Sequence, residues 1–300
     1  MIFRTMLIVT AFSAIGTAAL AGESDAPAAW VADVPMLNCD GVPCVDVQFG
    51  QGPTGLAVID SGDVASLVDV TDEQAAGFDG KQKAGPYDLA HPDVAVGAVV
   101  LKSVPTIGFS LKDDIAKGEM PHSRFVLAYP AFKNRIVQLD FIHHRVRISD
   151  VLAAPAACSG ECASLTSPTF GKAGPPIVVA SGFAVNGHPI TVQVDTVYTG
   201  NLLIYSASIT KLGLSTAADT ANIEHFAFTD GGVNMRKTSA PTIAFDGKTI
   251  AQDAPLYFPT AGVHEPDGMF DGTVGLVLMQ DKVVTFDFHD KTISIATASG

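Results

Sequence analysis

The stretch FAVNGHPITVQVDTVYTGNLLI (183–204) contains two runs of β-branched and apolar residues separated by Asn186-Gly187. An Asn-Gly pair between such runs is typical of a two-residue hairpin turn, because both turn positions require positive φ angles. The second run ends at Asp195, an acidic residue directly after an apolar strand. Patterns elsewhere in the chain are needed to tell whether this aspartate is a turn residue or a catalytic residue.

The same pattern occurs earlier in the chain. VIDSGDVASLV (58–68) aligns without a gap with QVDTVYTGNLL (193–203), and the alignment places Asp60 on Asp195. Internal similarity at this level indicates a repeated structural unit. We therefore expect both aspartates to end equivalent strands.

A second pair of similar stretches lies downstream of the aspartates. RFVLAYPAFKNRIVQLDFIHHRVRI (124–148) aligns without a gap with DGTVGLVLMQDKVVTFDFHDKTISI (271–295). Each copy has period two and a polar turn after an Asp-Phe pair, which predicts two strands. We predict two similar lobes, an N-terminal lobe over 36–152 and a C-terminal lobe over 163–300, joined by a linker at 153–162.

The composition favours strands over helices. Charged residues make up only 16% of the chain, and short apolar runs are separated by turn signals such as Asp230-Gly231 and Asp246-Gly247. Two short segments look helical, TDEQAAGF (71–78) and YSASITKLGL (205–214), and each follows one of the two aspartates. The sequence therefore predicts an all-β protein in which each lobe has a short helix.

The N-terminus has the features of an export signal. Arg4 precedes an apolar run that ends in Ala19-Leu20-Ala21, a small-residue cleavage site. We predict a signal peptide over 1–21, an N-terminal tail over 22–35, and a protein exported to the periplasm or secreted. No other segment approaches the ~20 apolar residues of a membrane span.

The chain is acidic, with a formal net charge of −13. Residues 1–21 hold one basic and no acidic residue, so the net charge without them is −14. Phosphate binding requires the opposite sign, which argues against a nucleic-acid partner.

The four cysteines form two close pairs, Cys39/Cys44 in CDGVPC and Cys158/Cys162 in CSGEC. In an oxidising compartment an even number of cysteines is typical of disulfides, and short glycine-containing loops can close each pair locally. The alternative is a zinc site with four cysteine ligands, which usually shows two-residue spacings. We expect two local disulfides.

The triplet Asp60-Ser61-Gly62 and the later Thr273-Val274-Gly275 carry a resemblance to a known family. With these residues the chain resembles the aspartic proteases, as a bacterial two-lobed member of the pepsin-like and retropepsin-like superfamily. The resemblance implies two β-lobes with a cleft between them, and a catalytic pair formed by Asp60 and Asp195. The supporting and binding residues that it implies are Ser61, Gly62, Thr196, Val197 and, in a flap over the substrate, Tyr87.

In each lobe one glycine of the family pattern is replaced. Val197 is the third residue of the second triplet, and Ala128 stands where the second lobe has Gly275. In the family the third triplet residue lies beside the carboxylate, where its amide supports the negative charge. Valine keeps that amide but adds a stiff, branched side chain. Such a side chain is tolerated at a negative φ and strained at a positive one.

Paired carboxylates suit peptide hydrolysis without a metal, because two carboxyls held together share one proton and their pKa values separate. Our first hypothesis is a monomeric aspartic-type endopeptidase, a hydrolase of peptide or protein substrates with no metal or organic cofactor. The alternative is a catalytically inactive protein of the same fold that binds peptide or protein in the cleft. A third hypothesis is an envelope structural protein whose lobes serve only as scaffold. Asp140 and Asp287 also repeat, and we expect them to form turns.

Overall fold

The structure is a computed structural model that describes residues 30–52, 54–69, 91–109, 111, 115–116, 122–150, 161–168, 177–214, 223–228, 231–260 and 268–297. Several predictions lie outside these ranges: the export signal (1–21), the first predicted helix (71–78), most of the linker (153–162), Tyr87 and Cys158.

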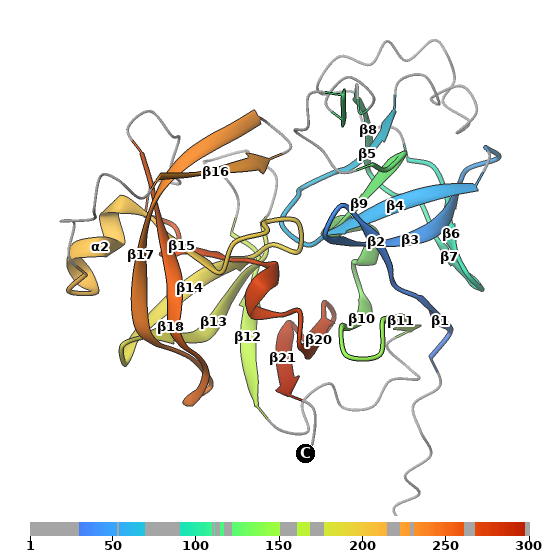
Figure 1. The fold of residues 1–300 in the computed structure, drawn as a ribbon. Coiled ribbons are helices and arrows are strands. Elements are labelled where there is room, and N and C mark those ends of the chain that lie inside the picture. The colour runs from blue at the N-terminus through green and yellow to red at the C-terminus, as the bar shows by residue number, and fades with distance from the viewer. Residues whose placement is uncertain are drawn as a thin grey trace, which may run out of the picture.

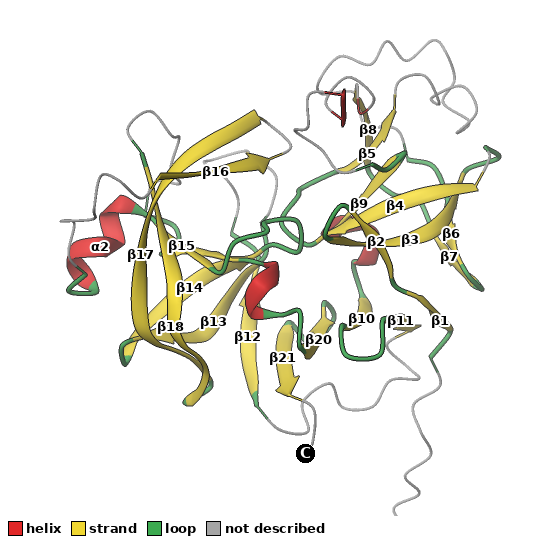
Figure 2. Ribbon diagram, viewed as in Figure 1, coloured by secondary structure: helices red, strands yellow, loops and turns green. Residues whose placement is uncertain are grey.

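The described part of the chain consists of β-strands and the loops between them, with very little helix, which confirms the all-β class (Figure 2). Helix α2 (Ser206–Lys211) forms within the second segment predicted to be helical, and Gly213 at φ 62° follows its last turn. Two short 3-10 helices, η1 (Tyr129–Phe132) and η3 (Leu276–Leu278), each follow a strand. Within the described ranges, no helix is both long and apolar enough to cross a membrane.

The N-terminal half forms an eight-stranded sheet in the order β7-β6-β3-β4-β9-β5-β8, with β2 paired to β3. Its strands are β2 (Leu37–Cys39), β3 (Val42–Phe49), β4 (Thr54–Asp60), β5 (Ser66–Asp69), β6 (Val94–Val96), β7 (Val99–Leu101), β8 (Thr106–Phe109) and β9 (Phe125–Ala128). Its core is made of alternating Val, Leu and Phe side chains, for example Val45, Val47 and Phe49 in β3.

The remaining strands form a thirteen-stranded sheet in the order β1-β11-β10-β20-β21-β12-β13-β14-β19-β15-β18-β17-β16. They are β1 (Ala32–Pro35), β10 (Arg135–Asp140), β11 (Arg145–Asp150), β12 (Cys162–Thr166), β13 (Val179–Val185), β14 (His188–Val194), β15 (Leu202–Ile204), β16 (Ile223–Phe228), β17 (Gly231–Phe245), β18 (Lys248–Pro259), β19 (Gly272–Val274), β20 (Lys282–Asp287) and β21 (Thr292–Thr297).

The two halves share one strand arrangement (Figure 1). In the N-terminal half, β4 lies parallel to β9, β9 antiparallel to β5, and β5 parallel to β8. In the C-terminal half, β14, β19, β15 and β18 repeat this order and these directions. Strands β4 and β14, which lead to Asp60 and Asp195, are therefore equivalent in the fold.

Six neighbouring strands, β1-β11-β10-β20-β21-β12, join the two halves. At their centre β10 pairs antiparallel with β20, and Gln138 lies opposite Thr285. These two residues are also equivalent in the alignment of 124–148 with 271–295. A local two-fold relation between the halves therefore passes through this pair, and Gln138 Nε2 donates to Thr285 Oγ1 at 3.1 Å.

The segment expected to be a tail (22–35) contributes a strand from residue 32 onward. Strand β1 pairs with β11 through four residues, with Val34 opposite Val146. Its sequence, ADVP, contains two residue types that are depleted in strands. An edge strand tolerates them, because only one side of its backbone takes part in the ladder.

Local turn chemistry agrees with the sequence. Asn186 and Gly187 have φ angles of 50° and 80° in the β13–β14 turn, and Asp246 and Gly247 have 46° and 79° between β17 and β18. These are the positive angles that two-residue hairpin turns require. Asp230 lies outside the described residues.

One predicted disulfide is present and closes the β2–β3 hairpin. Cys39 and Cys44 are bonded, with their Cα atoms 6.0 Å apart. This confirms local pairing for the first cysteine pair and excludes its participation in a zinc site. Cys162 is also disulfide-bonded.

Candidate active site

The two aspartates lie at the ends of equivalent strands. Asp60 is the last residue of β4 and is 4% exposed. Along β14, alternate side chains point to opposite faces, and Val192 and Val194 are buried in the core. Gln193 and Asp195 therefore share the other face, and both are half-buried.

The two triplets are hydrogen-bonded to each other across the junction of the halves. Ser61 Oγ donates to the carbonyl oxygen of Val194 at 2.7 Å, and Thr196 Oγ1 donates to that of Ile59 at 2.5 Å. These two bonds are related by the repeat, since each hydroxyl binds the residue before the other half's aspartate. In addition, the Ser61 N–H donates to Thr196 Oγ1 at 3.0 Å. The hydroxyls of Ser61 and Thr196 therefore join the loop after β4 to the loop after β14.

Each carboxylate is held by the backbone of its own loop. Asp60 Oδ1 accepts hydrogen bonds from the N–H groups of Gly62 (2.8 Å) and Asp63 (2.9 Å). Asp195 Oδ1 accepts equivalent bonds from Val197 (2.8 Å) and Tyr198 (3.0 Å). Valine at the third triplet position thus keeps its amide on the carboxylate, as glycine does in the first triplet.

The first triplet lies against the second carboxylate. A Cβ atom built on Gly62 would be 2.7 Å from Asp195 Cγ and 2.8 Å from Asp195 Oδ2. Neither Gly62 nor Val197 is among the residues with positive φ. The backbone at Val197 is therefore compatible with a β-branched residue, and its half-buried side chain packs against the main core.

The surroundings raise the pKa of both carboxyls. For Asp60 the largest cause is burial, followed by the negative charges of Asp195 and Asp63, and its pKa lies well above the ordinary value. For Asp195 burial also raises the pKa, while the N–H bonds from Val197 and Tyr198 oppose the rise. Burial and mutual repulsion are the conditions under which neighbouring carboxyls retain a shared proton.

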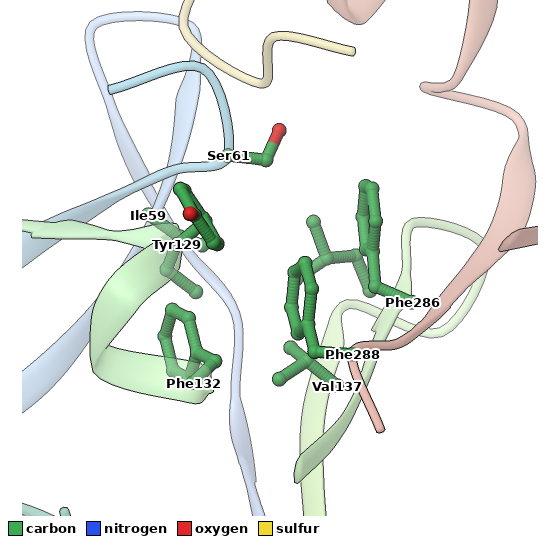
Figure 3. Close-up of a pocket in the computed structure, with 8 residues that line it drawn as sticks. Ile59, Ser61, Tyr129, Phe132, Val137, Phe286 and Phe288 are labelled. Atoms are coloured by element: carbon green, nitrogen blue, oxygen red, sulfur yellow. The ribbon is translucent and has the colours of Figure 1, made fainter. Parts of the chain in front are cut away.

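A small apolar hollow lies beneath the first triplet (Figure 3). Its lining comes from both halves of the chain: Ile59, Ser61, Tyr129, Phe132, Val137, Leu139, Phe286 and Phe288. The rings of Phe286 and Phe288 stack with centroids 5.6 Å apart, and Tyr129 lies 5.8 Å from Phe288. These aromatic side chains lie around Ile59 and Ser61, the residues on either side of Asp60 in the sequence.

The equivalent positions of Gly275 and Ala128 place different demands on the residue in the two halves. A Cβ on Gly275 would lie 2.3 Å from the carbonyl oxygen of Gly200, so the second half requires glycine there. In the first half Ala128 fits in a fully buried position, and its N–H donates to Ser66 Oγ at 3.2 Å.

Sequence reasoning did not identify three residues at this site. Asp63 adds a third carboxylate beside Asp60. Gln193 Nε2 donates to the carbonyl oxygen of Gly62 at 2.7 Å. Tyr198 is buried next to Asp195, and burial raises the pKa of its hydroxyl. For Gln193 the sequence did contain a signal, because it is a polar residue between the valines that lead to Asp195.

The other repeated aspartates form turns, as expected. Asp140 Oδ1 accepts the N–H of His143 at 2.9 Å, and Arg147 binds its second oxygen at 3.0 Å. Asp287 Oδ1 accepts the N–H groups of His289 and Asp290 at 2.9 and 2.8 Å.

Among the described residues, one group of side chains has ligand atoms within 4.8 Å of one another: Asp287, His289 and Asp290. His289 and Asp290 are exposed in the β20–β21 turn, and the Asp287 carboxylate already accepts a backbone N–H of that turn. We assign no metal to this group.

No family model and no curated protein matches the chain. Among solved structures, the crystal structure of a retropepsin-like aspartic protease from Rickettsia conorii is similar to part of it. The two share 15% identity over 40% of this chain and 82% of that chain, with a TM-score of 0.30. At this level the likeness assigns no function, and the function of the site is argued from its own geometry.

Proposed function

We propose that the protein is an aspartic-type endopeptidase that hydrolyses peptide bonds with a water molecule activated by Asp60 and Asp195. The observation that carries the proposal is the pair of reciprocal hydrogen bonds from Ser61 and Thr196. These bonds tie together the two loops that carry the carboxylates, and the closeness of Gly62 to Asp195 supports a shared site.

The chemistry follows from one shared proton. With one carboxyl ionised and the other protonated, the ionised group accepts a proton from water as that water attacks the scissile carbonyl carbon. The protonated group donates its proton to the carbonyl oxygen, which gives a neutral tetrahedral diol. The carboxyl that took the proton from water then gives it to the amide nitrogen, while the ionised carboxyl takes a proton from a hydroxyl of the diol. The C–N bond breaks, acid and amine are released, and the pair again holds one proton. The two carboxyls titrate as one coupled unit, so the proton belongs to the pair.

Two further features support the proposal. The matching strand orders of the two halves support an internal duplication, in which each half supplies one of the two aspartates. The Cys39–Cys44 disulfide supports an oxidising compartment, in agreement with export directed by residues 1–21. N-terminal sequencing of the protein recovered from cells tests the proposed cleavage after Ala21.

The direct test is hydrolysis of an unstructured protein such as unfolded casein between pH 3 and 7. Asp60→Asn and Asp195→Asn should each abolish cleavage, because neither variant can hold one proton between two carboxyls. Asp253→Asn is the matched control, since Asp253 is exposed at φ 48°, an angle that asparagine accepts readily. Asp60 and Asp195 are called the dyad below. Cleavage by either Asp→Asn variant of the dyad at the rate of the control would refute the proposal.

The alternative, binding without hydrolysis, rests on Val197. This residue occupies the third position of the second triplet, where the first triplet has Gly62. Binding of a statine-type inhibitor separates the two functions, because a mimic of the tetrahedral diol binds tightly only to a competent dyad. An inactive protein that binds extended peptides but not the inhibitor would favour the alternative. Recovery of hydrolysis in Val197→Gly would then identify the valine as the cause.

A further inference from the structure

Gln193 is a polar residue between two fully buried valines of β14, Val192 and Val194, and its side chain reaches the loop of the other triplet. It precedes Asp195 by two residues and lies on the same face of β14. Its Nε2 donates to the carbonyl oxygen of Gly62 at 2.7 Å. The equivalent position in the first repeat is Val58, which is fully buried and has no side-chain donor.

One peptide unit connects Gln193 to Asp60. The carbonyl group of Gly62 and the N–H of Asp63 belong to the same amide. The carbonyl accepts from Gln193, and the N–H donates to Asp60 Oδ1 at 2.9 Å. Hydrogen bonds at the two ends of one amide polarise it and strengthen each other.

We propose that Gln193 is a positioning residue of the dyad: its amide holds and polarises the Gly62–Asp63 peptide so that the N–H of this peptide stabilises the ionised carboxylate of Asp60. This inference rests on the proposed function only for the catalytic meaning of Asp60. It assigns to the C-terminal half a specific influence on the aspartate of the N-terminal half.

The second repeat lacks this support. The equivalent peptide lies between Val197 and Tyr198, and its N–H donates to Asp195 at 3.0 Å. The residue that would polarise it by symmetry is Val58, which has no polar group. The two aspartates are therefore supported unequally, in spite of their equivalent places in the fold.

The charged groups around Asp60 oppose its ionisation, and Gln193 acts against them. Among the described residues, the titratable groups that act on Asp60 are Asp195, from the loop after β14, and Asp63, from its own loop. Both are acidic and oppose its ionisation. Gln193 is neutral and acts in the opposite direction, by strengthening an N–H donor.

The experiment uses the full chain and three variants. Gln193→Met keeps the shape of the side chain and removes the donor, whereas Gln193→Asn keeps the amide but is one methylene too short to reach Gly62. Gln138→Met is the matched control, because Gln138 also donates across the junction of the halves, to Thr285 rather than to a triplet loop. Thermal melts of each variant establish that it is folded.

The readout is the pH titration of the Asp60 and Asp195 carboxyl carbons by ¹³C NMR, assigned with the two Asp→Asn variants. In both Gln193 variants we expect the titration of Asp60 to move to higher pH by about half a unit, and that of Asp195 to move less. The acid limb of the pH–rate profile should move in the same direction. An unmoved Asp60 titration in the folded variants, or an equal shift in Gln138→Met, would overturn the inference.

This readout does not depend on catalysis. If the protein is inactive and the Asp60 titration still moves on loss of the Gln193 amide, the proposed function fails and the inference holds. If the protein hydrolyses peptides and the titration does not move, the inference fails and the function holds.

Discussion

Gly62 and Asp195 are in direct contact across the junction of the two halves, with space for no atom between the Gly62 Cα and the carboxylate. The backbone of the first triplet therefore forms one wall around the aspartate of the second. At the mirror position, the Val197 side chain packs against the core instead. The repeat thus requires glycine on one side and tolerates valine on the other.

Replacing Gly62 should therefore disable the site. In Gly62→Ala the new Cβ would lie 2.7 Å from Asp195 Cγ, so the loop or the carboxylate must shift. Displacements of this size cost about 100-fold in rate and overpacking costs about 1–3 kcal/mol of stability. The matched variant Val197→Ala should keep kcat/KM near the wild-type value, because the position already holds a Cβ. Wild-type hydrolysis by Gly62→Ala would show that this contact does not position the dyad.

Loss of the reciprocal hydrogen bonds should destabilise the junction. Ser61→Ala and Thr196→Val each leave a carbonyl of the other half without its donor. A buried acceptor left unpaired costs about 1–3 kcal/mol, measurable by urea denaturation. The double variant should lose less than the sum of the single losses, because the two side chains share one network. Ser164→Ala, at an exposed position, serves as the control. Full additivity would contradict a shared network.

Asp63 should set the acidity at which the dyad works. Its negative charge raises the pKa of Asp60, after burial and the charge of Asp195. Asp63→Asn removes the charge and keeps the N–H that donates to Asp60, so the pKa should fall and the acid limb of the pH–rate profile should move to lower pH. The exposed Asp46→Asn variant controls for the change in net charge. A shift to higher pH would mean that Asp63 supports ionisation of Asp60.

The dyad should also make stability depend on pH. Burial, with the Asp195 charge second, raises the folded-state pKa of Asp60 above the ordinary value of 3.8, so the folded protein holds this proton more tightly than the unfolded chain. The contribution is fully present below pH 3.8 and is lost as the pH rises through the raised pKa. Each unit of increase corresponds to about 1.4 kcal/mol.

Asp60→Asn should therefore be more stable than the wild type at pH 7, and the difference should shrink at pH 4. Urea denaturation at the two pH values measures it. A variant that loses more stability at pH 7 than at pH 4 would show that the folded protein favours the ionised form of Asp60.

The sequence predicted the features that local chemistry determines. The Asn186-Gly187 turn and the strand that ends at Asp195 follow from φ requirements and from periodicity. The equivalence of the strands that lead to Asp60 and Asp195 followed from two repeats in the same order, and the catalytic role of the pair stays a prediction.

Features that depend on pairing between distant segments were not accessible from the sequence. Strand β1 forms only because β11 offers an edge, and its own residues do not favour a strand. The contact of Gln193 with Gly62 joins residues far apart in the chain. Whether valine is tolerated at position 197 depends on the backbone φ angle there, which no sequence pattern specifies.

Strand β1 also sets a limit on how far the N-terminus can be shortened. Within the described residues it is the outer strand of its sheet, and the Val31 N–H extends the pairing by donating to the Ile148 carbonyl at 2.9 Å. Trimming that stops before residue 31 would leave this ladder intact. Removal of β1 would uncover the backbone of β11 as an unpaired edge, the kind of surface on which chains associate and aggregate. A few residues at the start of the fold thus protect the joined halves from pairing with other molecules.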